Sequence, residues 1–297
     1  MNEAVSYLDH GYVKLLDTGG GDAFISKFAR CSFQNQDEQR TAKQDARLID
    51  YLIRHHHTSP LEAGELWVEM KAPIFVFRQH MRHRMASLNE QSLRYSTHDG
   101  DYYIPELDRF KTNDKWNKQG SGDNLPLHLA ETYRTLIKEQ SESQWATYCK
   151  LARLDPDNGQ PLEHDDLPPL TKELARIILG TNFYSTLCWK IDTKNLMNYL
   201  ALRNDPHAQW EIQELAKIIE GFFAEAFPAT YKAFVKHYRN STTYTQDEHR
   251  VLNEVLGGSV LDIQELIEDW SDSRKKEFGT KLGFDFVNEL GFEDGEA

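Results

Sequence analysis

The run "RHRMASLNEQSLRYS" at residues 82–96 concentrates hydrogen-bonding side chains in a chain that is otherwise acidic. Between Arg78 and Tyr95 there are four arginines and a single acidic residue, Glu90. Guanidinium groups form forked hydrogen bonds to phosphates and to planar carbonyl edges. The amides and hydroxyls between the arginines add neutral donors and acceptors, and an ionised carboxylate accepts N–H groups or sugar hydroxyls. This combination is typical of a site for a phosphorylated ring compound such as a nucleotide.

Two simpler interpretations compete with a nucleotide site. The arginines could form ion pairs with acidic surface helices, since such pairs are common and weak. They could also form a basic patch for nucleic acid. The formal net charge of the 297 residues is −13 at pH 7, however, and nonspecific binding to a polyanion needs a broad basic face. We therefore expect no nucleic-acid partner.

The composition predicts a folded protein of a reducing compartment. Hydrophobic residues make up 39% and aromatic residues 11% of the chain, enough for a substantial core. No apolar run approaches the ~20 residues of a membrane span, and the N-terminus lacks the pattern of an export signal. The three cysteines, Cys31, Cys149 and Cys188, form no CxxC pair, which argues against a disulfide framework. We expect a cytoplasmic protein with no membrane partner.

Apolar periodicity predicts the elements that position the arginine cluster. Strands are expected at 12–17, 65–71 and 187–191, and helices at 23–33, 37–54, 73–85, 170–180, 193–203 and 207–227. Pro73 opens the helix that enters the cluster, at a position where a missing N–H costs nothing. Thr193 is the expected cap of a later helix. One stripe of the helix after Pro73 should face the core, and it consists of Ile74, Phe77, Met81, Met85 and Leu88.

Polar and acidic segments set the expected domain boundaries. Residues 109–130 and 153–170 are rich in Asp, Asn, Gly, Pro and Lys, which predicts surface loops. Residues 241–297 hold fourteen acidic and five basic side chains, so the acidity is concentrated in a tail. We expect one domain over residues 1–240 and an acidic C-terminal extension, helical or partly disordered, over residues 241–297.

Three segments of the chain resemble those of the flavin-dependent thymidylate synthases. The first is the run at residues 82–96, in which Arg-His-Arg is followed after seven residues by Ser92. The second, "HHHTSPLEAGELWVEMKAPIFVFRQHMRHR", leads into it, and the third is "ELARIILGTNFYSTLCWKIDTKNLMNYLALRNDPHAQWEIQ". The resemblance covers about residues 12–235. It implies an α/β (α+β) fold, with a mixed or antiparallel sheet flanked by helices and a helical bundle.

The resemblance also implies a binding surface for dUMP. Its residues are Gln79, Arg82, Glu90, Gln91, Ser92, Leu93, Arg94, Arg176 and Arg203. Ser92 and Arg94 suit the phosphate, and Arg203 matches an arginine that contacts the pyrimidine and carries the catalytic role. A guanidinium beside the N3–O edge of uracil stabilises negative charge that develops there, which polarises the ring for bond formation at C5.

A second set of residues matches contacts to FAD. It consists of Ser32, His57, Ser59, Arg82, His83, Arg84, Glu90, Asp192, Thr193, Lys194, Asn198 and His207. Ser59 stands where the family pattern often has threonine, a change that keeps the hydroxyl. The run "TGGGD" lacks the spacing of a dinucleotide-fold motif, and the family resembled does not bind FAD through such a fold.

The implied reaction is reductive methylation of dUMP to dTMP. Methylenetetrahydrofolate gives the carbon, NADPH reduces the flavin, and reduced FAD gives the hydride. The family forms homotetramers with active sites shared between chains, and no enzyme nucleophile is required. The three cysteines have no neighbouring base in sequence, so each is expected to be a small core residue.

Two rival functions are left open by the residues. A metal-dependent nucleotide phosphohydrolase could use "THD" at 97–99, "EHD" at 163–165 and the histidines at 55–57. Three adjacent histidines cannot all face one ion on a regular element, however, so we expect no metal. The other rival is a non-catalytic nucleotide sensor that has kept the fold.

Overall fold

The computed structural model describes residues 3–34, 40–113, 121–162, 167–256, 267, 269–270 and 272–282. The chain divides into two compact units, Met1–His237 and Tyr238–Ala297. The first unit contains every segment with candidate site residues. Each unit is described by itself below.

The first unit is built on a five-stranded antiparallel sheet with the strand order β1-β2-β3-β7-β4. The strands are β1 (Val5–Tyr7), β2 (Gly11–Gly19), β3 (Glu65–Pro73), β4 (Ser87–Glu90) and β7 (Tyr184–Asp192). A separate hairpin pairs β5 (Lys111–Asn113) with β6 (Ser121–Asn124). Strand β7 therefore lies between β3 and the segment that carries the arginine cluster.

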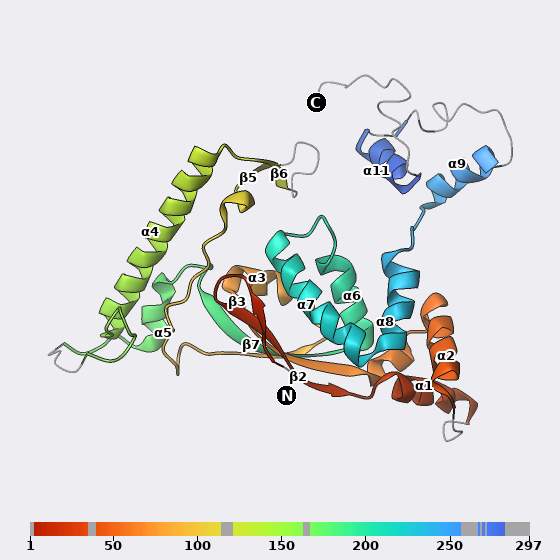
Figure 1. Cartoon of the computed structure of the whole chain (residues 1–297), viewed down its shortest axis with the longest axis horizontal. Coiled ribbons are helices and arrows are strands. Elements are labelled where there is room, and N and C mark those ends of the chain that lie inside the picture. The colour runs from red at the N-terminus through yellow and green to blue at the C-terminus, as the bar shows by residue number, and fades with distance from the viewer. Residues whose placement is uncertain are drawn as a thin grey trace. The chain divides into compact units, whose positions relative to one another are not determined.

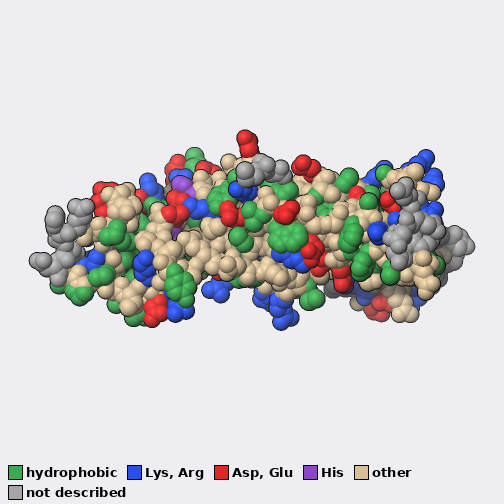
Figure 2. All heavy atoms as spheres, turned by 90° about the horizontal axis from the view of Figure 1, so that it is seen from below, with side chains coloured by type: hydrophobic (Ala, Val, Ile, Leu, Met, Phe, Trp, Pro, Cys, Tyr) green, Lys and Arg blue, Asp and Glu red, His purple; other side chains and the backbone are tan. Residues whose placement is uncertain are grey.

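Alternation along the central strands gives the sheet two different faces. On β3 the side chains of Leu66, Val68 and Met70 are buried, while their neighbours are only half-buried. Helices α3 (Ile74–His80), α6 (Thr193–Arg203) and α7 (Trp210–Ala226) cover the apolar face (Figure 1). Figure 2 shows the molecule from below the view of Figure 1, where uncharged side chains and backbone cover much of the middle, with charged side chains between them.

Two further groups of helices stand at the ends of the sheet (Figure 1). One consists of α1 (Asp22–Arg30), α2 (Ala42–Arg54) and α8 (Pro228–Phe234), which contact one another. The other joins α4 (Leu127–Ala152) to α5 (Lys172–Ala175) through a small core that includes Tyr148 and Cys149. The shorter helical turns are η1 (Cys31–Phe33), η2 (Ser59–Ala63), η3 (Leu107–Arg109), η4 (Arg176–Ile178) and η5 (Val235–Arg239).

The predicted helix through the arginine cluster is wrong beyond His80. Met85 and Leu88, expected in the core, are 72% and 44% exposed. The reason is sheet pairing, because Ser87–Glu90 adds to β7 as strand β4 instead of continuing the helix. Arg82 and His83 therefore lie in the turn after α3, not on its surface as predicted. A helical spacing of apolar residues did not reveal that an edge of the sheet was available to the same segment.

Other boundaries shift for local reasons. The helix predicted at 37–54 begins at Ala42, because Thr41 and Gln44 form a reciprocal capping box. The helix expected at 170–180 is confined to α5 and the turn η4. The cap of α6 is Asp192, whose carboxylate accepts from Asn195 N, and not the predicted Thr193. Leu127–Ala130, expected in a loop, forms the first turn of α4.

The cysteines differ in their surroundings, and none forms a disulfide. Cys149 is buried, as expected, and burial together with nearby Asp155 raises the pKa of its thiol to about 11. Cys188 is half-buried on β7. Cys31 is exposed at the end of α1, so the expectation of a core residue is wrong there. Its helical position did not specify which side of the turn faces solvent.

The second unit has its own small core. Helices α9 (Gln246–Leu256) and α11 (Asp272–Leu282) contribute Val251 and Phe278, which cluster with Ile267 and Trp270. The Arg274 guanidinium lies 3.9 Å from the centre of the Trp270 ring. Within the described part of the whole chain, no helix is long and apolar enough to cross a bilayer.

Candidate active site

The C-terminal end of α6 meets the turn after α3 through Arg203. Its Nε donates to His83 Nε2 at 3.0 Å, and its Nη2 donates to the main-chain carbonyl of Gln79 at 3.1 Å. The Gln79 amide also donates to Gln209. Arg203 thus joins two predicted site residues that lie 120 and 124 positions before it in sequence, and we call this group the Arg203 cluster (Gln79, His83 and Arg203).

The imidazole of His83 is held in one protonation state. Because Nε2 accepts the Arg203 N–H, the single ring proton of the neutral form lies on Nδ1. Burial, and then the Arg203 guanidinium, lower the pKa of His83 to about 4, so the ring is neutral at pH 7. Among the described residues Nδ1–H has no acceptor, which leaves a directed donor for a ligand.

A buried aromatic platform supports this group from below. The hydroxyl of Tyr199 and Nδ1 of His80 are 3.1 Å apart, and both side chains are fully buried. The Tyr199 ring meets the rings of His80 and His83 edge to face, at 5.0 and 4.9 Å between centres. Since Tyr199 and Arg203 are one helical turn apart, α6 presents both to the same neighbours. Burial lowers the pKa of His80 to about 3, which keeps its ring neutral as well.

A cavity of about 720 Å³ opens at the N-terminal end of α6. This volume is within the ~300–1,000 Å³ of typical ligand pockets. Four of the residues predicted to contact FAD line it, namely Ser32, His57, Ser59 and Lys194. The remaining wall includes Arg30 and His56, with the aromatic rings of Phe33 and Tyr51. Bases, hydroxyls and flat apolar rings therefore converge on one space, which we call the α6 cavity.

The turn that ends α2 fixes His57 at the wall of this cavity. His56 has a left-handed backbone, with φ of 58°, and its N–H donates to the Ile53 carbonyl. The N–H of His57 then reaches back to the carbonyl of Leu52 at 2.8 Å. This is the hydrogen-bond pattern that closes many helices. Lys194, on the opposite element, is oriented by a 2.8 Å contact to Glu62.

The predicted nucleotide loop, residues 90–94, follows strand β4 on the other side of β7. Gln91 N donates to the Thr186 carbonyl at 2.8 Å, which ties the start of the loop to β7. Arg94 reaches α5, where its Nε lies 3.5 Å from Glu173. Arg176 follows Glu173 by three residues in a helical turn and so projects on the same side. Arg94, predicted to bind the phosphate, and Arg176, predicted to bind dUMP, are therefore both at α5.

These three groups are not contiguous within one chain. Lys194 and Arg203 stand at opposite ends of α6, about 14 Å apart along its axis at 1.5 Å per residue. Glu90 is paired with Leu187, five residues before Asp192 on β7, which is about 17 Å of strand. The FAD residues that line the α6 cavity therefore lie apart from the Arg203 cluster and from the nucleotide loop, although His83 and Glu90, also predicted to contact FAD, belong to those two groups.

Several predicted residues have structural partners or stand alone. Asp192 caps α6, and the Thr193 hydroxyl donates to the Leu61 carbonyl. His207 is exposed beside Asp205, at 2.8 Å. Asn198, Arg82 and Arg84 are exposed, and neither of these two arginines forms an ion pair with a described residue. The interpretation of the cluster as a set of surface ion pairs is therefore not supported for them.

The sequence interpretation missed several residues in the wall of the α6 cavity, among them Arg30, Tyr51 and His56. Arg30 and His56 were detectable in principle, because they lie two and one positions from the predicted Ser32 and His57. Tyr51 carried no such signal, since its position on α2 outside the apolar stripe is typical of an ordinary surface residue.

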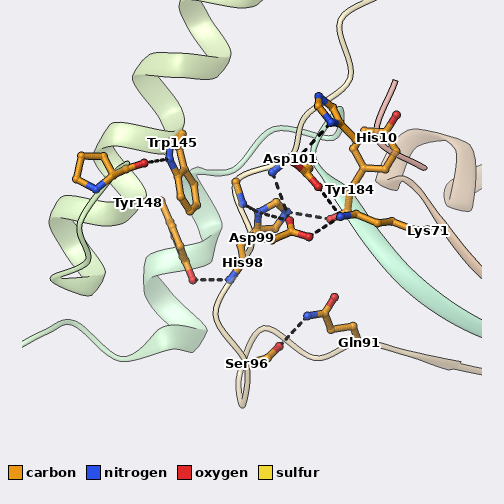
Figure 3. Close-up of polar contacts among 12 residues, drawn as sticks. His10, Lys71, Gln91, Ser96, His98, Asp99, Asp101, Trp145, Tyr148 and Tyr184 are labelled. Atoms are coloured by element: carbon orange, nitrogen blue, oxygen red, sulfur yellow. Dashed lines mark hydrogen bonds and ion pairs between the residues drawn. The ribbon is translucent and has the colours of Figure 1, made fainter. Parts of the chain in front are cut away.

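The "THD" segment forms a structural anchor and not a metal site (Figure 3). His98 Nε2 donates to the Tyr184 carbonyl at 2.9 Å, and Nδ1 accepts from Gly100 N at 2.8 Å, so both ring nitrogens are used. Asp99 bonds to Lys71 at 2.5 Å. Within the described ranges no group of three or more His, Cys, Asp or Glu side chains could hold an ion. The "EHD" segment at 163–165 lies outside the described residues.

Comparison with known proteins decides the family. A family model described as "Thymidylate synthase complementing protein" (Thy1) matches residues 14–229. The chain is 37% identical over 251 residues to a "Flavin-dependent thymidylate synthase" from Ehrlichia ruminantium (strain Gardel), which covers 84% of this chain and 79% of that protein.

The chain belongs to the flavin-dependent thymidylate synthase family.

A second relative of the same description, from Rickettsia prowazekii (strain Madrid E), is 34% identical over 277 residues, or 93% of this chain and 91% of that protein. Among solved structures, a UMP/dUMP methylase from Streptomyces cacaoi bound with 5-Br dUMP superposes with a TM-score of 0.66. It is 28% identical and covers 80% of this chain and 100% of that chain.

Family membership makes the chain an enzyme of the methyltransferase class that takes part in dTMP biosynthesis with FAD as its cofactor. Nucleotide and folate substrates follow from the same membership. The rival functions, a metal-dependent phosphohydrolase and a non-catalytic sensor, are therefore set aside. The α/β (α+β) fold expected from the resemblance is confirmed, with a sheet that is antiparallel throughout.

Proposed function

We propose that the Arg203 cluster is the place where this thymidylate synthase activates dUMP, with Arg203 as the catalytic residue. The observation that carries the proposal is the pair of hydrogen bonds from Arg203 to His83 and Gln79. They fix the positively charged guanidinium in a half-buried position, next to an imidazole that stays neutral at pH 7. Electrostatic stabilisation of this preorganised kind contributes ~10²–10³ in rate per donor in well-studied enzymes.

Arg203 acts on the pyrimidine ring in this proposal. Placed against the N3–O edge of uracil, its guanidinium lowers the energy of negative charge in the ring and so promotes bond formation at C5. His83 contributes the Nδ1–H donor, which neutral imidazole retains over the physiological pH range because its pKa is about 4. Gln79 adds an amide that can read a ring carbonyl or N–H.

The phosphate of dUMP is assigned to the other end of the nucleotide set. Ser92 and Arg94 of the loop, with Arg176 beside them, offer a hydroxyl and two guanidinium groups, the chemistry that holds a phosphate dianion. Glu90, Gln91 and Leu93 complete the loop, and Arg82 is shared with the flavin set. The contact of Arg94 with Glu173 is exposed on both sides. An exposed ion pair is weak, so a phosphate can displace it.

The α6 cavity is assigned to FAD, and its donor set fits that molecule. Lys194 and His57 suit a diphosphate, while Ser32 and Ser59 suit phosphate or ribose oxygens. The rings of Phe33 and Tyr51 suit a flat heterocycle. Reduced FAD supplies the hydride that completes the methyl group. Arg82, His83, Arg84, Glu90, Asp192, Asn198 and His207 are proposed as further FAD contacts, whereas Thr193 is fully buried with its hydroxyl donated to the Leu61 carbonyl and is not.

We propose further that the active site is assembled between chains of a homotetramer. The support is the separation, within one chain, of the α6 cavity from the residues predicted to bind dUMP, together with the exposure of Arg82 and Arg84. Residues 1–240 would form the catalytic domain and residues 241–297 an extension. Methylenetetrahydrofolate and NADPH are proposed as the carbon and electron donors. The three unpaired cysteines support the cytoplasm as its location.

The decisive experiment follows NADPH oxidation by the purified flavoprotein under low oxygen, with and without dUMP, while flavin absorbance is recorded. We expect dUMP to accelerate flavin bleaching, and methylenetetrahydrofolate to restore the oxidised spectrum with formation of dTMP. The same assay on Arg203→Ala should show flavin bleaching that no longer responds to dUMP. Bleaching that dUMP accelerates as in the wild type, with normal dTMP formation, would overturn the assignment of the Arg203 cluster to the pyrimidine.

A truncation tests the domain proposal. Ending the chain at Asn240 should leave flavin content and the tetramer unchanged, because the second unit has a core of its own. Size-exclusion chromatography with absorbance at the flavin band measures both. Colourless monomers would contradict the proposed boundary.

A further inference from the structure

Lys71, which is in neither the predicted dUMP set nor the predicted FAD set, bonds to the segment through which the nucleotide loop rejoins the sheet. Lys71 lies on β3 with a side chain only 14% exposed, and its Nζ is 2.5 Å from Asp99 Oδ2 and 2.5 Å from Asp101 Oδ2 (Figure 3). Both carboxylates belong to the segment that follows the nucleotide loop. One ammonium group with three donors can satisfy two acceptors at once. We call Lys71, Asp99 and Asp101 the Lys71 clamp.

The register of the sheet explains why this position controls the loop. Lys71 is directly paired with Thr186 of β7, and the carbonyl of Thr186 accepts from Gln91 N, where the loop leaves the sheet. Two residues away on β7, the N–H of Tyr184 donates to the Asp101 carbonyl, where the segment returns. Residues 91–101 therefore form a loop that leaves and rejoins the sheet beside the same part of β7. The Lys71 clamp lies where this loop rejoins the sheet, and His98 binds the loop to β7 a second time through the Tyr184 carbonyl.

Hydrogen bonds within the loop connect the Lys71 clamp to Ser92 and Arg94, the proposed phosphate-binding residues. The carbonyl of Ser92 accepts from the main-chain N–H groups of Tyr95 and Ser96 at 3.0 and 3.1 Å. Gln91 Nε2 donates to Ser96 Oγ at 3.1 Å (Figure 3). The turn from Ser92 to Ser96 is therefore stiff, and it is joined to His98 after one residue. A shift at Asp99 would move Ser92 and Arg94.

Charge makes Lys71 the indispensable member of the clamp. Burial alone would lower the pKa of Lys71, but the hydrogen bonds that it donates to Asp101 and Asp99 outweigh this effect and raise the pKa. The lysine therefore stays charged and neutralises two carboxylates that bond to the same atom. Without it, these like charges would repel each other across the base of the loop.

We propose that Lys71 is a positioning residue that holds the nucleotide loop in the conformation that receives the phosphate of dUMP. The inference rests on the proposed role of Ser92 and Arg94. A loop that is ordered before binding loses less conformational entropy on binding than a loop that is free to move. Loss of the clamp should therefore weaken dUMP binding while leaving the later chemistry in place.

The test is the Lys71→Met variant of the full-length flavoprotein. The side chain keeps its length and loses its charge. We expect KM and Kd for dUMP to rise about tenfold, with kcat within about threefold of wild type and FAD content unchanged. Hydrogen exchange of the peptide over residues 91–101 should accelerate without dUMP present. Lys71→Arg, which can also bond two carboxylates, should restore most of the affinity.

Matched controls separate the possible failures. Lys138→Met removes a lysine from an exposed ion pair with Glu142 on α4 and should leave KM unchanged. Arg94→Ala tests the role of the loop itself. If Arg94→Ala binds dUMP normally, the proposed phosphate site is wrong. If Arg94→Ala weakens binding and Lys71→Met does not, only the clamp is wrong.

A second variant covers loss of folding. If Lys71→Met yields no soluble flavoprotein, the Asp99→Asn/Asp101→Asn double variant keeps Lys71 and removes both ionic partners. It should raise KM for dUMP in the same way, with the same change in exchange over residues 91–101. Equal loss of kcat, FAD content and dUMP affinity in either variant would mark a general structural role and overturn the proposal.

Discussion

The two ends of helix α6 differ in what their polar groups face. At the C-terminal end, Arg203 is bonded to His83 and Gln79 over a buried platform, and the whole group exists in the isolated chain. At the N-terminal end, Lys194 and His57 face an open cavity of about 720 Å³. One end is preorganised by the fold, and the other presents donors to a space large enough for a ligand.

This difference indicates that the charge-stabilising group is preorganised in the folded chain, whereas the donors proposed for the cofactor face a cavity. Charge stabilisation works best when the dipoles are fixed before reaction, because no energy is then spent on reorienting them. A cofactor pocket has the opposite requirement, since its donors must exchange water for the ligand. We therefore expect changes at the two ends to separate turnover from flavin binding.

The largest effect is expected from Arg203→Ala. It removes the fixed charge beside the pyrimidine, so dTMP formation should fall by ~10²-fold or more. FAD should remain bound, since the α6 cavity is at the other end of the helix. Single-turnover formation of dTMP measures the first and the visible flavin spectrum measures the second. Near-normal turnover would remove Arg203 from the mechanism.

An intermediate effect is expected from Lys194→Ala. The variant loses one charge-assisted contact in the α6 cavity, so the Kd for FAD should rise about tenfold. The fraction that retains flavin should turn over at close to the wild-type rate. The matched control is Lys217→Ala, which removes an exposed lysine paired with Glu214 on α7. Equal flavin content in the two variants would show that the two ends of α6 do not differ as proposed.

The smallest effect is a pH dependence of stability. The folded-state pKa of His83 is about 4 and that of His80 about 3, both below the ~6.5 of an unfolded histidine. At pH values between about 4 and about 6.5, the two histidines bind more protons in the unfolded chain than in the folded chain. The free energy of unfolding therefore falls as the pH falls from about 6.5. Thermal midpoints from pH 7 to pH 5 should decrease accordingly.

A double variant sharpens this prediction. His80→Phe/Tyr199→Phe removes both members of the buried hydrogen bond, so neither partner is left unsatisfied. With one depressed histidine gone, the decrease in thermal midpoint between pH 7 and pH 5 should be shallower. A slope as steep as in the wild type would mean that His80 does not titrate in the way its burial predicts.

Sequence patterns were reliable where one periodicity applied and unreliable where two elements competed for a segment. Strand β3 alternates clearly, and its buried side chains are those the pattern predicts. Residues 81–88 show a helical spacing, yet Ser87–Glu90 pairs with β7. Pairing energy at a sheet edge depends on a neighbour about 100 residues away, which no local pattern can contain.

The family, the central strands and the chemistry of the arginine cluster could be predicted from the sequence, because motifs and alternation are properties of neighbouring residues. Which of those residues contact one another was visible only in the tertiary structure. It joined Arg203 to His83 across 120 positions, gathered Ser32, His57, Ser59 and Lys194 around one cavity, and brought Lys71 under the nucleotide loop. Such contacts depend on strand register and helix packing, which arise only when the whole chain has folded.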